Sequence, residues 1–355
     1  MSDDSGGATG EGSAAAVVDE ALREQFTWYV VAKKEFQDAS RSKGLWMLTL
    51  VFTVLFITPA LAIIYDLVSL SRQEQELGTE LLITGIPVAN YLNIVTVLLP
   101  LIAMFVGYGA LTKERESGSL KVLLSLPFSR RDVIVGKVAG RCLVVAVSLA
   151  AGFGLTALFL VGSNITFNAG LYALFALFTG GLALVMVAIA VSISGAVPSS
   201  RLSLVANAFV YVYFTFIWNS LANGVSNLLN NQLGIGGSLR WHLTLFIKLL
   251  SPTQSYKTLV DSMVGSGENA ERLARLGMFS RDADTEVICG DVLRGNFTTV
   301  TVQGFGNQTF ERPVCEAGSQ AVPLYFSDPA VFVYLLAWIG VAAAVSYYTF
   351  EKVDL

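Results

Sequence analysis

The sequence predicts an all-α polytopic membrane protein with six transmembrane helices, an N-terminal interfacial amphipathic helix and a small α+β extracytoplasmic domain between spans five and six. Of the 355 residues, 54% are hydrophobic and 14% are charged, whereas a soluble domain carries about 25% charged residues. The uncharged runs reach the roughly 20 residues that a helix needs to cross a bilayer. The alternative, an unusually apolar soluble enzyme, would have to hide more apolar surface than its size allows.

The N-terminal residues precede any span. Residues 1–24 are acidic and rich in Gly, Ser and Ala, without the basic start and apolar core of a secretory signal, which indicates a disordered tail. Residues 25–43 mix aromatic side chains such as Trp28 and Phe36 with Lys33 and Lys34. This mixture favours an amphipathic helix in the inner interface that turns into the first span. A plain solvated helix is the alternative.

Five uncharged runs locate the spans, and they are Gly44–Tyr65, Leu81–Thr112, Cys142–Ser200, Leu202–Leu239 and Pro329–Phe350. The third run is long enough for two crossings, because the polar stretch Gly162–Gly170 can form a turn between them. Residues 44–222 therefore hold five spans, and residues 329–355 hold the sixth span and the C-terminus. The predicted spans lie near 45–65, 91–112, 138–161, 171–195, 202–222 and 330–350.

The basic residues predict the orientation of the spans, because short cytoplasmic flanks are enriched in Lys and Arg. With the N-terminus inside, fourteen of the 23 lysines and arginines fall on the inner side. Most of the others lie in the long region after the fifth span, and long outer regions translocate largely regardless of charge. We therefore expect a multi-pass protein of the cell membrane with both termini in the cytoplasm.

Residues 223–328 form the expected extracytoplasmic domain. Its first half contains helical stretches, and residues 285–315 are rich in β-branched residues and turn formers, which favours a short antiparallel sheet. Cys289 and Cys315 fall in this region, where disulfides persist. A Cys289–Cys315 bond is predicted, and two free thiols are the alternative. Three N-x-[ST] triplets on the predicted outer side are candidate glycosylation sites or plain loop asparagines, at Asn164, Asn296 and Asn307.

Several kinds of chemistry are excluded by the sequence. The chain has one histidine and lacks a GxxxxGK[ST] loop, a GxSxG elbow and an HExxH motif. The predicted spans carry no Asp, Glu or His at mid-depth, so a proton relay or an intramembrane protease centre has no residues to use. We therefore expect no catalytic residues, no metal, no cofactor and no nucleic-acid partner. What remains is a passive pore or anchor, or the membrane half of a machine whose motor is another chain.

One dense, mostly basic segment, Lys113–Arg141, interrupts the apolar sequence. Leu120, Leu123 and Leu124 stand at helical spacing, and Pro127 ends this short helix. Ser129–Asp132 then resembles a capping box that opens the next helix. The pattern indicates a compact helix–break–helix on the cytoplasmic side. The alternative, a loop that only fixes topology, needs positive charge but neither a leucine stripe nor a Glu-x-Glu pair.

This segment also resembles the cytoplasmic loop of type 2 ABC transporter permeases, of the kind found beside nitrous-oxide-reductase accessory genes. The matching positions are Glu114, Glu116, Gly118, Ser119, Leu120, Leu123, Leu124, Ser125, Pro127, Ser129, Arg130, Gly136 and Lys137. The ending Phe350–Leu355 and the stretch Ala32–Phe36 are similar to the same family. The outer region after span five is larger than expected of the family, and the match does not cover it.

The resemblance implies that the segment 113–137 is a coupling helix seated in a cleft of a separate ATPase subunit, which would bind the ATP and magnesium. The candidate ATPase-coupling residues are Glu114, Glu116, Ser117, Gly118, Leu120, Leu123, Leu124, Pro127 and Arg130. Two permease halves are needed for a translocation path, so a second copy or a similar chain is expected. Membrane lipid and an extracytoplasmic binding or accessory protein are further candidate partners.

The leading hypothesis is therefore a permease subunit of an ABC transporter that moves an unidentified substrate while a separate ATPase subunit hydrolyses ATP. The alternative is a membrane anchor or assembly factor whose outer domain recruits a partner protein without transport. A complex that contains an ATPase subunit would favour the first hypothesis over the second.

Overall fold

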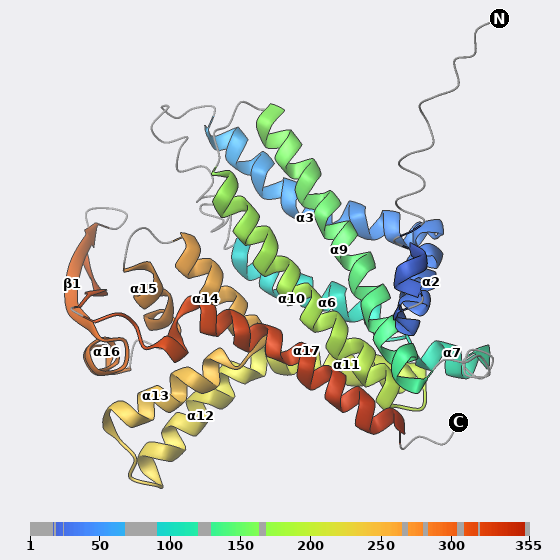
Figure 1. Ribbon diagram of the computed structural model, residues 1–355. Coiled ribbons are helices and arrows are strands. Elements are labelled where there is room, and N and C mark those ends of the chain that lie inside the picture. Colours follow the sequence, from blue (N-terminus) through green and yellow to red (C-terminus); the bar gives the residue numbers. More distant parts are fainter. Residues whose placement is uncertain are drawn as a thin grey trace, which may run out of the picture.

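The computed structural model is mostly helical, with one two-stranded hairpin at one end of the part that it describes (Figure 1). The described residues are 17, 19–23, 25–67, 91–119, 129–162, 168–264, 269–279, 283–303, 309–318 and 320–351. Among them, 5 helices are long and apolar enough to cross a membrane, and a bent helix pair at the N-terminal end makes up to 6. The expectation of a helical protein with about six spans is confirmed at this level.

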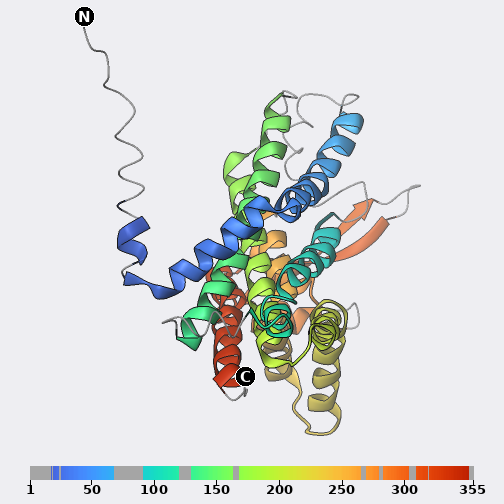
Figure 2. The ribbon, with the colours of Figure 1, turned by 90° about the vertical axis from the view of Figure 1, so that its right-hand side faces the viewer.

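The bent pair consists of α2 (Thr27–Arg41) and α3 (Lys43–Leu67), whose axes differ by 76°. Ser42 breaks the helix because its backbone is extended, with ψ at 151°. Its hydroxyl donates to the carbonyl of Ala39 and accepts from the backbone N–H of Gly44. Figure 1 shows α2 beside one end of α9 (Arg130–Gly162) and α3 turning away from it to run along α9, and in Figure 2 α2 again lies beside that end. An interfacial helix that leads into a span requires such a bend. The location of α2 in the membrane interface stays a prediction.

The centre of the bundle is α10 (Ala169–Ala196), which packs against α6 (Tyr91–Gly107), α9 (Arg130–Gly162) and the last helix. Asn168 caps the N-terminus of α10, since its side chain accepts from two backbone N–H groups. A Cβ at Gly107 would lie 2.6 Å from that of Ala190, so this glycine lets α6 and α10 touch closely. The spans predicted near 91–112, 138–161 and 171–195 correspond to these three helices.

The fifth span is a helix of 32 residues, built from α11 (Ser200–Val212), a π-helical turn and α12 (Trp218–Asn231). It continues past residue 222, where the sequence turns polar and where the predicted span ends. The extension packs against α13 (Gly237–Leu249), which follows a short connection. Helical structure persists here because a neighbouring helix covers one face of this polar stretch.

The helices α13 and α14 (Pro252–Val264) reach in among the spans instead of staying at one end of them (Figure 1). The indole of Trp338 donates to the carbonyl of Leu250, in the turn between α13 and α14, at 2.8 Å. The hydroxyls of Tyr256 and Thr179 lie 3.1 Å apart, and Thr179 is near the middle of α10. A hairpin from the region predicted to be extracytoplasmic therefore packs against the central part of the bundle.

The rest of this region is compact and mixed in structure. It contains α15 (Ala270–Leu276), α16 (Thr285–Val287) with a π-helical turn after it, and the antiparallel strands β1 (Gly295–Gln303) and β2 (Thr309–Ala317). Cys289 and Cys315 form a disulfide that joins the turn to β2, with their Cα atoms 5.6 Å apart. Asn296 lies in β1 opposite Glu316, whereas Asn164 and Asn307 fall outside the described residues.

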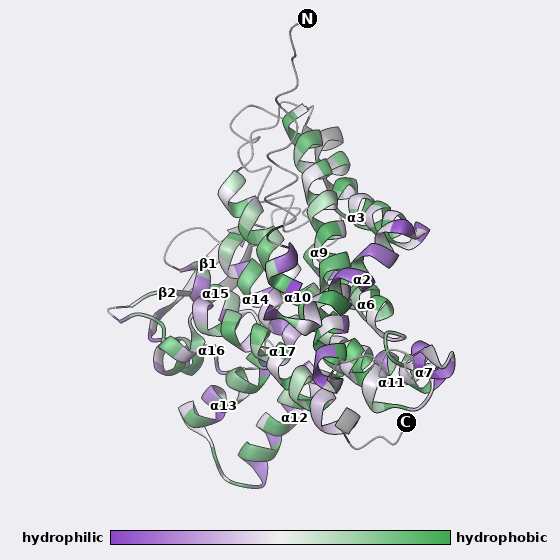
Figure 3. Cartoon of the chain, turned by 45° about the vertical axis from the view of Figure 1, so that its right-hand side comes forward, coloured by the Kyte–Doolittle hydropathy of each residue, from purple (hydrophilic) through white to green (hydrophobic). Residues whose placement is uncertain are grey.

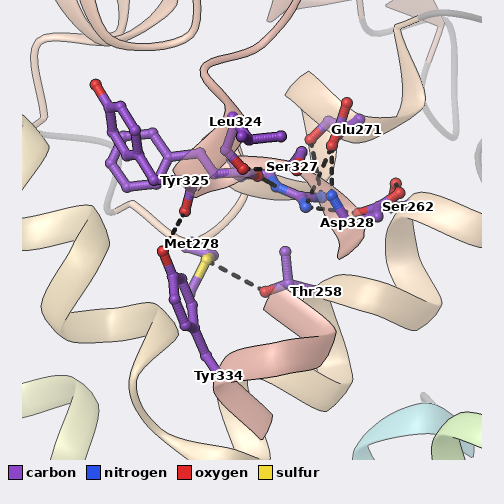
Figure 4. Close-up of polar contacts among 11 residues, drawn as sticks. Thr258, Ser262, Glu271, Met278, Leu324, Tyr325, Ser327, Asp328 and Tyr334 are labelled. Carbon is purple, nitrogen blue, oxygen red and sulfur yellow. Dashed lines mark hydrogen bonds and ion pairs between the residues drawn. The ribbon is translucent and has the colours of Figure 1, made fainter. Parts of the chain in front are cut away.

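Hydrogen bonds and an ion pair attach this region to the last span, α17 (Asp328–Glu351). The carboxylate of Asp328 accepts from the Ser262 hydroxyl at 2.7 Å, and its backbone N–H donates to Glu271 at 2.7 Å (Figure 4). The guanidinium of Arg275, whose side chain is fully buried, pairs with the other Asp328 oxygen at 2.5 Å. The start of α17 is thus bound to α14 and α15, so these elements are joined at one point.

Candidate functional site at the basic segment

The described start of the basic segment lies at the end of the bundle near the C-terminus (Figure 1). It contains α7 (Thr112–Glu116), so Glu114 and Glu116 are helical, and Ser117 and Gly118 follow directly. Figure 3 shows hydrophilic residues gathered on α7, beside a bundle that is mostly hydrophobic. Arg130 opens α9, and its side chain lies outside the description. Four further candidate residues lie outside the described part of the chain, namely Leu120, Leu123, Leu124 and Pro127.

Gly118 ends α7 with a left-handed backbone conformation, at φ 76°. A residue with a side chain is strained in this conformation, and helices commonly end at such a glycine. The backbone N–H of Gly118 donates to the carbonyl of Arg115, and the Ser117 hydroxyl donates to the carbonyl of Glu114. Ser117 and Gly118 together therefore make α7 a short, defined element.

Glu116 binds the N-terminus of α11. Its two carboxylate oxygens accept from the backbone N–H of Ser200 at 2.7 Å and from the Ser200 hydroxyl at 2.6 Å. The N–H groups of a first helical turn have no partners within the helix, and a negative charge there is favourable. Glu116 thus joins the end of α7 to the start of the fifth span.

Arg115 binds the other side of the same junction. Its guanidinium donates to the carbonyls of Val197 at 2.9 Å and Gly195 at 3.3 Å, at the C-terminal end of α10. Carbonyl groups in a last helical turn lack partners within the helix, and a cation there is favourable. The hydroxyl of Ser194 also accepts from the backbone N–H groups of Leu111 and Thr112. The segment around α7 is therefore bound to both helices of the α10–α11 connection.

Glu114 belongs to a buried ion cluster. The ammonium of Lys137, a side chain that is 1% exposed, lies 2.7 Å from Glu114 and 2.7 Å from Glu35. The other oxygen of Glu35 lies 3.1 Å from the guanidinium of Arg141. Two carboxylates and two cations therefore balance in charge, which is the condition under which buried ions are tolerated. The cluster joins three elements, α2, α7 and α9.

Two glycines bring α2 against α9 and so assemble this cluster. A Cβ at Gly136 would lie 2.5 Å from the Cβ of Val31, and one at Gly140 would lie 2.5 Å from that of Glu35. Small residues four apart allow helices to approach closely. Lys137 stands between the two glycines, and Arg141 follows the second one. The spacing Gly136–Gly140 is thus the signal in the sequence that could have located the partner helix.

The sequence analysis missed two participants of this arrangement. It gave no role to Glu35, although the residue lies within the family-like stretch Ala32–Phe36, and none to Arg115, which stands between the two selected glutamates. Glu35 and Lys137 are 102 residues apart in the chain. Their pairing depends on how α2 crosses α9, and a local pattern does not contain that information.

The described contacts attach the segment to the ends of several helices. Through Glu114, Arg115 and Glu116, α7 is bound to α9, α10 and α11, and through Lys137 it is connected to α2. A displacement of α7 cannot leave these helix ends in place unless charged hydrogen bonds and ion pairs break. The site can therefore transmit movement to several spans at once.

Comparisons with a family model and with individual proteins point to the same family. Residues 29–355 match the family described as ABC-2 family transporter protein. A probable ABC transporter permease protein NosY of Stutzerimonas stutzeri is 29% identical over 264 residues, which cover 72% of this chain and 87% of that protein. The protein of the same name from Pseudomonas aeruginosa PAO1 is 27% identical over 237 residues, which cover 65% of this chain and 80% of the relative.

Proposed function

The chain belongs to the ABC-2 family of transporter proteins, and we propose that its segment 113–137 receives the motion of the partner ATPase subunit. The chain is a multi-pass permease subunit without catalytic activity of its own, and ATP hydrolysis belongs to the ATPase that the family implies. The substrate is not identified by the sequence or by the described residues.

The contacts of α7 are the observation that supports this proposal. A short helix that protrudes from the bundle and is bound to the ends of α9, α10 and α11 is a suitable receiver for a force from outside the membrane. Closure of an ATPase dimer would push such an element, and rigid coupling would convert the push into tilting of the spans. Glu114 and Glu116 then act as positioning residues that hold α7 to the spans.

We assign the surface toward the ATPase to the part of the segment that follows α7. Its leucine stripe, Leu120, Leu123 and Leu124, lies outside the described residues, so this assignment rests on the sequence. A stripe of leucines on a short helix in water needs a covering surface, and an apolar cleft in the ATPase would provide one. Ser117 and Ser119, at the end of α7, are exposed and would lie near that surface.

The orientation of the chain is also a proposal. The segment 113–137 faces the cytoplasm if the ATPase docks there, and both termini then lie on the same side. The positive-inside rule supports this orientation, because fourteen of the 23 basic residues gather on that side. The region with the disulfide and the β-hairpin then lies outside, where a binding or accessory protein could reach it.

A second permease copy, either this chain or a similar one, completes the proposed transporter. The outer face of the fifth span presents a helical stripe of exposed apolar side chains, at Val205, Phe209, Val212 and Phe216. Their spacing of three and four residues places them on one face of the helix. We propose that lipid or the second permease covers this face.

The docking proposal predicts different effects for two neighbouring substitutions. Leu123→Asp introduces an unpaired charge into an apolar pocket, at a cost of several kcal/mol. We expect a tagged Leu123→Asp permease to insert into the membrane and to lose the ATPase during purification. Lys121→Ala, the control on the same stretch predicted to be helical, should retain it. If the two variants retain equal amounts of ATPase, the leucine stripe is not the docking surface.

A further inference from the structure

A groove of about 480 Å³ lies between α9, α10 and α17, near the end of the bundle that carries α7. Its lining is mainly aliphatic, and the small side chains of Ala139, Ala188 and Ala343 provide the space. Ser192 also lines the groove, and its hydroxyl lies within hydrogen-bonding distance of the carbonyls of Ala188 and Ala342, at 2.8 and 2.7 Å. The body of the groove is therefore suited to hydrocarbon.

A cation stands at one end of this groove. The guanidinium of Arg131 lies 4.4 Å from the centroid of the Tyr347 ring, and it donates a hydrogen bond to the Tyr347 hydroxyl. Arg131 is nevertheless exposed. Stacking uses the face of the guanidinium and the bond to Tyr347 uses one N–H at its edge, and because a guanidinium carries five N–H donors, a phosphate can bind at the edge as well. The nearby carboxylate of Asp132 accepts from the backbone N–H and the hydroxyl of Ser129.

The length of the groove matches one leaflet of a membrane. Arg131 and Ala139 are eight residues apart on α9, which corresponds to about 12 Å of helix. Ile339 and Tyr347 have the same separation on α17. Half of the hydrocarbon core of a bilayer is about 15 Å thick. The groove thus combines a basic mouth with an apolar body about 12 Å long, close to the thickness of one leaflet of the hydrocarbon core.

We propose that this groove binds one anionic phospholipid from the leaflet on the α7 side, with an acyl chain in the groove and its phosphate on Arg131. A free phosphate would contact the mouth alone and gain nothing from the apolar body. A zwitterionic lipid would occupy the body, but its positive headgroup would weaken the attraction to Arg131. A bound lipid would bridge the helix that leaves the coupling segment and the last span.

Native mass spectrometry of the purified full-length permease, titrated with phosphatidylglycerol or phosphatidylcholine, tests this proposal. We expect the wild-type protein to retain phosphatidylglycerol more strongly. Arg131→Gln should weaken phosphatidylglycerol binding about fivefold, the contribution expected of one arginine beside anionic lipid, and should leave phosphatidylcholine unchanged. Ala343→Leu fills the groove and should weaken both lipids. Arg131→Lys, which keeps the charge, should retain the preference and shows that a change at this position permits folding.

Arg201→Gln is the matched control, because Arg201 is another exposed basic residue at the same end of the bundle and does not line the groove. It should bind both lipids as the wild type does. Three results would overturn the proposal: equal retention of the two lipids by the wild type, an equal loss in Arg201→Gln, or binding of glycerol 3-phosphate as tightly as of phosphatidylglycerol. The last result would indicate a site for the anion alone.

Discussion

Replacing Lys137 by methionine is expected to destabilise the permease by about 3 kcal/mol, because the change removes a buried cation and leaves Glu114 unpaired and the buried Glu35 with Arg141 alone. The Lys137 ammonium lies between Glu35 and Glu114, and its side chain is 1% exposed. Among the described residues, Arg141 pairs with the second oxygen of Glu35 and with no other carboxylate. Thermal unfolding of the detergent-purified protein should show a lower midpoint, and α7 should lose its attachment to α2 and α9.

Lys113→Met is the matched control for this result. Lys113 is an exposed lysine of α7 whose ammonium lies 4.8 Å above the Tyr108 ring, a contact worth about 0.5–1 kcal/mol at an exposed site. The double variant Lys137→Met, Glu35→Gln removes one cation and one buried anion together, so it should recover part of the lost stability. Equal midpoints for Lys137→Met and Lys113→Met would show that the cluster does not hold α7 in place.

Loss of the Cys289–Cys315 disulfide is expected to lower stability by a similar amount. The loss should be confined to the region after α12. The bond closes a separation of 26 residues, which corresponds to roughly 3–4 kcal/mol in the chain-entropy treatment. Both cysteines are fully buried, and the bond ties the turn after α16 to β2. We expect the double variant Cys289→Ser, Cys315→Ser to become sensitive to protease within residues 283–318, whereas the helices of the bundle stay protected.

Cys142→Ser provides the control for the disulfide. Cys142 is the free cysteine in α9, and its thiol makes a long contact of 3.8 Å with the carbonyl of Leu184. Its replacement should leave the proteolysis pattern unchanged. If the double variant resists protease as well as Cys142→Ser does, the packing of the hairpin alone is sufficient and the bond contributes little.

The spans were predictable because they depend on local hydrophobicity. Each of the long helices α9, α10 and α17 contains an uncharged run longer than 20 residues, and such a run has few alternatives to crossing a membrane. The break at Ser42 is also a local feature, because the amphipathic stretch 25–43 gives way there to an uncharged run. The end of α7 at Gly118 was not predicted, because the sequence pattern predicted the end of the short helix at Pro127.

The insertion of α13 and α14 was not predictable by the same means. Lys248, Lys257 and Asp261 give this stretch the composition of a soluble region. In the structure the ammonium of Lys248 donates to the carbonyl of Met278 at 2.7 Å, and that of Lys257 donates to the side chain of Asn93 at 3.0 Å. Charged residues with hydrogen-bond partners can be accommodated inside a bundle. A hydropathy pattern contains no information about such partners.

The candidate site was predictable in position but not in its contacts. The sequence selected Glu114 and Glu116 as members of a coupling segment, and a local pattern could go no further. The partners of these residues are Lys137 and Ser200, and the latter is 84 positions away from Glu116. Such pairs exist because α7 packs where the ends of three other helices meet, and tertiary packing determines that meeting point.

Cross-linking from α7 to the ATPase subunit tests the coupling proposal most directly. A cysteine-specific photo-cross-linker is attached at Ser117→Cys, an exposed position at the end of α7, or at Val300→Cys, an exposed position on β1, in each case with Cys142 replaced by serine. In membranes that contain the assembled transporter, we predict an adduct with the ATPase from position 117 and none from position 300. An ATPase adduct from position 300, or none from position 117 in a complex that retains its ATPase, would contradict the account.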